Sequence, residues 1–218
     1  MSYKQMKYYL ELEDYSTAYR IAHEDWDTNP SLVWPRNSIA WLLIRMMKAN
    51  ANACSMKTFT QQLEEFKNLG IPHDNKKLWG AVAWPIRDIV QDSYQMQWFT
   101  SEFGDNLFDT IQNMPFDRPS ESYSAMLAAF IRLGSLWSRL AEFIEWWGFG
   151  NFTNYDYRRY PEKGRLESLA EKVFIVYIGI LCREGKHREP SKKFFEGLRK
   201  MESISKEQAD RVYACVRY

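Results

Sequence analysis

The chain has 218 residues and a formal net charge of +1, with 45% hydrophobic and 26% charged residues. These values are ordinary for one large globular domain or two small ones, and they exclude a strong overall attraction for charged partners. The three cysteines, Cys54, Cys182 and Cys215, lie far apart with no CxxC spacing. This pattern argues against a disulfide framework or a zinc site and indicates a reducing compartment.

The sequence predicts a cytoplasmic protein with no membrane segment. The residues after Met1 contain no apolar stretch of the kind found in a signal peptide. The longest uncharged apolar run, Val173 to Cys182, is too short to cross a bilayer as a helix.

Residues 2–30 predict two helices that meet at a short break around Glu13. Asp14, Tyr15, Ala18 and Pro30 lie at the relative spacings of a tetratricopeptide repeat, which this segment resembles. The resemblance implies a helix pair in which small alanines let the two helices approach closely. Glu13 stands where that family usually has a turn glycine, and Asp25-Trp26 replaces a small residue and an aliphatic one.

A second pair of helices is predicted between Trp34-Pro35 and Pro72. The first helix begins with proline in its first turn and stops in the polar stretch 48–53. The second carries Phe59, Leu63 and Phe66 on one face and ends at Gly70, which suits a C-terminal cap.

From Asp74 a fifth helix is predicted, with a kink or a split at Pro85, because proline removes a backbone donor and clashes with the preceding turn. A short segment around Phe99 is expected to break at Gly104-Asp105. A further short helix follows and ends at Met114-Pro115.

The loop 115–121 contains two prolines and is the predicted hinge of a single 1–218 domain, dividing residues 1–114 from 122–218. Ser120 or Ser122 is expected to cap the next helix, which ends at Gly134. Another helix is expected from Trp137 to Trp147, since the apolar residues in this stretch are spaced by three, four or seven.

Three more helices are expected after residue 165, which brings the total to about eleven. The predicted fold is therefore all-α, with stacked antiparallel helix pairs in an α-solenoid similar to tetratricopeptide repeats.

No arrangement typical of catalysis is found. His23, His73 and His187 lack metal-ligand spacings, and the sequence has no phosphate-binding loop and no nucleophile elbow. We expect no enzymatic activity, no cofactor and no metal site.

The loop 150–161 is the first candidate for a partner-binding site, because it mixes aromatic residues with arginines. The candidate residues are Phe152, Tyr155, Tyr157, Arg158, Arg159 and Tyr160. Three interpretations stay open: rings buried over the helix ends, an interface with another protein or peptide, or stacking on nucleic-acid bases.

A basic C-terminal part is the second candidate. Residues 151–218 carry a net charge of +5 and residues 1–150 a net charge of −4. Arg188, Lys192 and Arg199 share a helical face and are candidate phosphate contacts, although Glu184, Glu189 and Glu196 interrupt the positive charge.

Two functions are predicted from these features. The first is a non-enzymatic helical-repeat scaffold that binds a partner protein. The alternative is an accessory nucleic-acid-binding protein that uses the basic C-terminal part. Trp146-Trp147-Gly148, the loop 150–161 and the stretch Ser168 to Val173 together are also similar to uncharacterised bacterial helical-repeat proteins. This resemblance implies a bacterial or phage origin and a role in a defence or phage-conflict system.

Overall fold

The computed structural model describes residues 2–116 and 120–147, and every regular element in these ranges is a helix. The all-α class is therefore confirmed for the described residues. The chain divides into two compact units, Met1–Asp117 and Arg118–Tyr218. Their boundary lies within the loop 115–121, and the role of that loop as a hinge stays a prediction.

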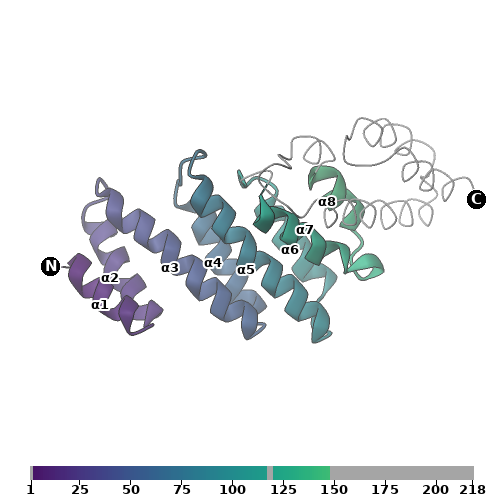
Figure 1. The fold of residues 1–218 in the computed structure, drawn as a ribbon, viewed down its shortest axis with the longest axis horizontal. Helices are drawn as coiled ribbons and strands as arrows, with labels where there is room; N and C mark the ends of the chain where they lie inside the picture. Colours follow the sequence, from purple (N-terminus) through teal and green to yellow (C-terminus); the bar gives the residue numbers. More distant parts are fainter. Residues whose placement is uncertain (1, 117–119, 148–218) are drawn as a thin grey trace, which may run out of the picture. The chain divides into compact units, whose positions relative to one another are not determined.

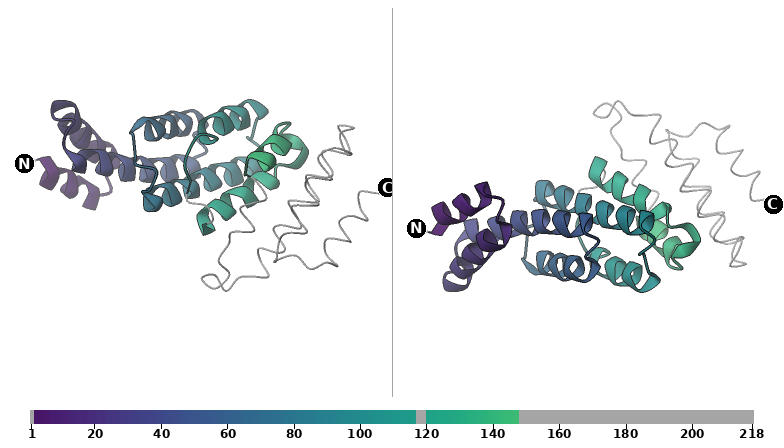
Figure 2. Two further views of the ribbon diagram at one scale, coloured as in Figure 1. Left: turned by 90° about the horizontal axis from the view of Figure 1, so that it is seen from above. Right: turned by 90° about the horizontal axis from the view of Figure 1, so that it is seen from below.

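Six helices form the described part of the first unit (Figure 1). They are α1 (Ser2–Glu11), α2 (Tyr15–Thr28), α3 (Val33–Asn52), α4 (Met56–Asn68), α5 (Lys76–Gln95) and α6 (Ser101–Ile111). Helix α2 packs against α1 and α3, α3 packs against α4 and α5, and α4 packs against α6. The views in Figure 2 show the same succession of helices, with α1 at one end of the unit.

Three turns of this unit share one backbone geometry. Glu13, Cys54 and Gln97 have φ values of 57°, 48° and 59°, in the left-handed region. In each case the following residue donates its N–H to the carbonyl five positions earlier: Asp14 to Tyr9, Ser55 to Asn50 and Trp98 to Ser93, at 2.8–3.0 Å. The left-handed residue itself donates to the carbonyl three positions earlier. This pair of bonds is a Schellman motif, which satisfies the last carbonyls of a helix.

Side-chain caps fix the start of several helices. Asp14 accepts a hydrogen bond from the Thr17 N–H at 3.1 Å, and Asn75 and Thr100 cap α5 and α6 in the same way. Each such cap contributes about 1 kcal/mol to helix stability. The predicted start of α2 after the break at Glu13-Asp14, and its predicted end at Asn29-Pro30, are confirmed.

The core of the first unit combines small and large side chains. Ala18 and Ala22 of α2 are fully buried, as are Phe59 and Phe66 of α4. The Trp79 ring meets the Phe66 ring edge-on at 5.5 Å, and its indole N–H donates to the Pro72 carbonyl at 2.9 Å. The predicted apolar face of α4 is confirmed, and so is the end of that helix at Gly70, which has a φ of 65°.

The predicted split at Pro85 and the predicted break at Gly104-Asp105 are wrong, whereas a kink at Pro85 stays a prediction. Helix α5 is not split at Pro85. Pro85 is buried within a helix of 20 residues, and buried apolar residues stabilise the turns on both sides of it. Gly104-Asp105 does not interrupt a helix. Thr100 caps α6, and the Gly104 N–H donates to the Thr100 carbonyl at 3.0 Å as part of the first turn. Gly104 is buried, so tertiary packing outweighs its poor helix propensity.

The described part of the second unit contains α7 (Glu121–Ile131), a 3₁₀ helix η1 (Gly134–Leu136) and α8 (Leu140–Trp147). Ser120 caps α7 by accepting from the Tyr123 N–H, as one of the two predicted serines. We expected Trp137 to belong to the helix that ends at Trp147, but it precedes that helix, α8. The backbone of Trp137 is extended after η1, yet its ring is buried and lies 5.4 Å from the Phe130 ring. Aromatic packing, rather than helical register, therefore places this side chain in the core.

The predicted helices beyond residue 165 lie outside the described residues. The described ranges contain eight α-helices, and the expected total of eleven stays a prediction.

Candidate functional site

The residues singled out in the sequence lie outside the part of the chain that the structure describes. They are Phe152, Tyr155, Tyr157, Arg158, Arg159 and Tyr160 of the aromatic loop, and Arg188, Lys192 and Arg199 of the basic part. Their roles stay predictions, and the candidate site below is built from described residues alone.

A hollow of about 280 Å³ lies between α1 and α3. We call it the α1/α3 groove. Its lining comes from Tyr3, Met6, Lys7 and Leu10 on α1 and from Asn37, Ser38, Trp41, Leu42 and Arg45 on α3. On both helices these positions follow spacings of three and four, so that each helix presents one continuous face to the groove.

The floor and the rim of this groove differ in chemistry. Met6 and Leu42 are 3% and 2% exposed, so they form a buried apolar floor. Tyr3 is 44% exposed and its ring meets the Trp34 ring edge-on at 5.0 Å, which gives the rim an aromatic edge. An apolar floor with a small number of polar groups at the rim is the usual composition of a ligand groove.

Positive charges lie over the aromatic rings in and beside the groove. The Lys7 ammonium is 4.9 Å from the Tyr3 ring centroid, the Arg45 guanidinium is 5.8 Å from that of Tyr15, and the Lys77 ammonium is 5.6 Å from that of Trp41. A cation at such a distance from a ring is held by about 0.5–1 kcal/mol when it is exposed. The rings therefore favour these positions of the charges while leaving them able to contact a ligand.

The lining carries no compensating negative charge. Lys7 and Arg45 are its charged members, and none of the nine lining residues is acidic. The side chains of Asn37 and Ser38 make no hydrogen bond to any residue that the structure describes. The groove thus offers fixed cations, amide and hydroxyl groups and an apolar floor, which together suit a ligand with carboxylates and an apolar side chain.

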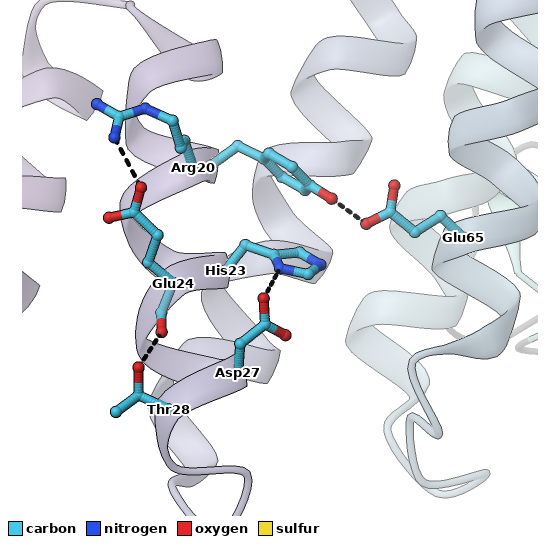
Figure 3. A network of polar contacts seen from close by, with 7 residues as sticks. Arg20, His23, Glu24, Asp27, Thr28 and Glu65 are labelled. Atoms are coloured by element: carbon cyan, nitrogen blue, oxygen red, sulfur yellow. Dashed lines mark hydrogen bonds and ion pairs between the residues drawn. The ribbon is translucent and has the colours of Figure 1, made fainter.

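A second polar cluster joins α2 to α4. Figure 3 shows Glu65 facing the α2 residues from a separate helix, and the Tyr19 hydroxyl donates a hydrogen bond to the Glu65 carboxylate. Burial and this carboxylate raise the pKa of Tyr19 well above its usual range. A pair of adjacent glutamates such as Glu64-Glu65 is usually found on a solvated helix face. Glu65 is instead part of the contact between two helices, because Tyr19 lies opposite it on α2.

On α2 itself this cluster continues through contacts one turn apart. His23 Nδ1 is 2.9 Å from the Asp27 carboxylate, and Arg20 donates to Glu24 at 2.7 Å (Figure 3). The His23 ring also lies between the rings of Tyr19 and Trp26, at 5.5 and 5.9 Å. These contacts order the α2 surface and leave His23 engaged, so we assign the cluster to a structural link between side chains of α2 and α4.

A third cluster lies at the C-terminal ends of α3 and α5. Burial raises the pKa of Asp92, the nearby charge of Asp88 raises it further, and Arg87 opposes this. Burial and then the charge of Asp92 raise the pKa of the Cys54 thiol. A thiol with a raised pKa carries little thiolate at neutral pH, so Cys54 is a poor nucleophile.

Within residues 2–116 and 120–147, no group of three His, Cys, Asp or Glu side chains is placed to hold a metal ion. The helices described there also include none with the length and apolar character needed to cross a membrane.

The predictions from the sequence did not include this groove, because they considered the residues of each helix that face the core. Trp34, Trp41 and Arg45 recur on α3 at spacings of seven and four, on a side of the helix that the apolar stripe does not use. This spacing is the signal in the sequence that could have indicated a second functional face on α3. This face of α3 lies opposite Tyr3 and Lys7 of α1 only because of the way in which the two helices pack in the tertiary structure.

Comparison of the chain with protein-family models, with curated proteins and with solved structures finds no match. The candidate function therefore rests on the groove itself.

Proposed function

We propose that the chain is a non-enzymatic helical-repeat scaffold that binds a segment of a partner protein in the α1/α3 groove. The observation that carries the proposal is the groove's lining. It combines an apolar floor with the fixed cations Lys7 and Arg45, and it contains no acidic residue. The segment that fits has acidic residues spaced around an aromatic or aliphatic anchor.

The repeated geometry of the turns supports the scaffold architecture. The Schellman turns at Glu13, Cys54 and Gln97 are 41 and 43 residues apart, so the chain returns to the same local structure at a near-constant interval. Trp41 of α3 and Trp84 of α5 are also 43 residues apart, and each ring has a cation near it. This interval is longer than the period of about 34 residues in tetratricopeptide repeats. We propose a related solenoid of stacked antiparallel helix pairs with longer units.

The affinity of such a groove comes from a few residues. Trp and Arg are the side chains most often found where truncation weakens an interface strongly. Trp41 supplies apolar area on the groove wall, and Arg45 can pair with a carboxylate. We expect Trp41→Ala and Arg45→Glu each to weaken partner binding by about 10-fold or more.

The test uses a displayed library of random peptides of about 12 residues, selected on the full-length chain and counter-selected on Trp41→Ala/Arg45→Glu. We expect selected peptides to be enriched in Asp and Glu around one large apolar residue. A photo-crosslinking residue at Ser38 should capture them, and the same residue at Thr60, in the hollow between α4 and α6, should not.

Peptides without acidic enrichment would contradict the proposed role of the groove, and so would a selection without the counter-selection step in which most peptides bind the double variant equally well. Melting temperatures of the variants, measured by circular dichroism, distinguish lost binding from lost folding.

The alternative, nucleic-acid binding through Arg188, Lys192 and Arg199, predicts affinity that falls steeply with salt. Binding of a fluorescent single- or double-stranded oligonucleotide at low salt, lost on Arg188→Ala/Lys192→Ala, would favour this function over the scaffold. Partners recovered from the native host that disappear after nuclease treatment would point the same way.

A further inference from the structure

The outer face of α1 carries an exposed tyrosine between opposite charges, and an exposed leucine directly follows the helix. Tyr8 and Leu12 are each 58% exposed, and Lys4 and Glu11 are exposed as well. Helix α1 lies at one end of the first unit (Figure 1), and its main neighbour there is α2. Among the residues that the structure describes, neither Lys4 nor Glu11 takes part in an ion pair.

Helical geometry places these residues on one side of α1. With 3.6 residues per turn, Glu11 is rotated about 20° from Lys4 and Tyr8 about 40°. The buried residue Met6 is about 160° from Tyr8, on the opposite side. The N–H of Leu12 donates to the Tyr8 carbonyl at 3.2 Å, which extends the helical turn and keeps Leu12 next to this face.

The charges on this face are arranged symmetrically along the helix. At a rise of 1.5 Å per residue, Lys4 and Glu11 lie about 5 Å on either side of their midpoint, and Tyr8 lies within about 1 Å of it. A two-fold axis through that midpoint places Lys4 of one copy opposite Glu11 of the other and brings the two Tyr8 rings together. A face with this property is complementary to itself, as an isologous contact requires.

We propose that α1 is a homotypic interface, in which the outer faces of two copies of this chain pack antiparallel about a two-fold axis near Tyr8. Each contact contains two Lys4–Glu11 pairs around the central Tyr8 rings, with Leu12 just beyond each pair. The face is short, so the dimer is weak and forms at micromolar concentrations rather than as an obligate assembly. This interface is separate from the α1/α3 groove, and it does not depend on the proposed function.

The test is a charge exchange, read by sedimentation velocity on the full-length chain from about 5 to 200 µM at low salt. Lys4→Glu places two acidic groups opposite each other, and Glu11→Lys places two basic groups opposite each other. Each change should weaken dimerisation by at least about 10-fold. The double variant Lys4→Glu/Glu11→Lys restores opposite pairs and should return the dissociation constant to within about 3-fold of the original.

Two controls accompany the exchange. Lys57→Glu makes the same change of charge at an exposed position of α4 and should leave dimerisation unchanged. Circular dichroism should show native helix content in every variant. A wild-type chain that stays monomeric up to 200 µM would overturn the proposal. So would single variants that dimerise normally, or a double variant that fails to recover.

Discussion

The hydroxyl of Tyr19 on α2 donates a hydrogen bond to the carboxylate of Glu65 on α4, a residue 46 positions later in the chain. This is a direct polar link between two helices of neighbouring pairs. It is half-buried, so solvent competes with it only in part. Its removal should therefore be visible in the stability of the first unit.

We expect Tyr19→Phe to lower the free energy of unfolding by about 1–2 kcal/mol at pH 8, because it removes a hydrogen bond to a charged acceptor. The measurement is urea denaturation. Tyr94→Phe, on a partly exposed tyrosine of α5, is the control and should stay within about 0.5 kcal/mol of the original.

The same tyrosine predicts a loss of stability in alkali. Burial and Glu65 raise the pKa of Tyr19 in the folded chain, whereas an unfolded tyrosine ionises near pH 10. The Tyr19 contribution is therefore fully present below pH 10 and declines as the pH rises above that value. The difference in unfolding free energy between wild type and Tyr19→Phe should shrink between pH 9 and pH 11. A constant difference across this range would contradict the assignment.

Replacing the left-handed residues of two exposed turns by glycine should stabilise the chain. Glu13 and Gln97 adopt positive φ, which costs a residue with a Cβ about 1–2 kcal/mol, whereas glycine adopts it freely. We expect Glu13→Gly and Gln97→Gly each to raise the unfolding free energy by about 0.5–1 kcal/mol, since the greater flexibility of glycine in the unfolded chain offsets part of the gain. Gln5→Gly, at an exposed position inside α1, should lower it by a similar amount.

Asp92 predicts a pH dependence of stability between pH 4 and pH 7. Its pKa is raised by burial and by the charge of Asp88, so folding favours the neutral form of this carboxyl. Keeping the Asp92 carboxyl ionised in the folded chain costs free energy. This cost is absent below about pH 4, the pKa of an aspartate in the unfolded chain, and it appears as the pH rises through the pKa of Asp92 in the folded chain. Asp92→Asn should therefore be more stable than wild type at pH 7, and the gap should close as the pH falls to 4. Asp74→Asn, in an exposed turn, should show no such gap.

Ala22 is fully buried, at the centre of the contacts of α2. We expect Ala22→Leu to destabilise the chain by about 1–3 kcal/mol, because the added carbons have no space and must displace a helix. Ala22→Ser changes the volume little and serves as the control for size. Thermal unfolding followed by circular dichroism measures both, and equal melting temperatures for Ala22→Leu and wild type would show that this contact is loose.

The local structure of the first two helix pairs could be predicted, because its signals lie within a few residues of their effects. Asp14 caps the helix that it precedes, and Gly70 ends the helix that it follows. The predicted break at Gly104 and the predicted split at Pro85 were wrong for one reason. Both residues weaken a helix in isolation, yet both are buried here, and the packing of their neighbours decides the outcome.

The candidate groove could be predicted only in part. The spacing of Trp34, Trp41 and Arg45 defines one face of α3, and that spacing is visible in the sequence. The partner of that face is α1, which belongs to a different helix pair. No local pattern states which two faces meet, so a groove shared between pairs emerges only from the tertiary structure.

The three Schellman turns also bear on how such a chain can change in length. Because Cys54 and Gln97 have the same backbone conformation and the same pattern of hydrogen bonds, either can serve as the junction between one helix and the next. Excision of residues 55–97 would join Cys54 to Trp98 with the turn geometry preserved on both sides. Duplication of that segment would preserve it equally. Genetic gain or loss of one whole period is thus compatible with the backbone of these turns.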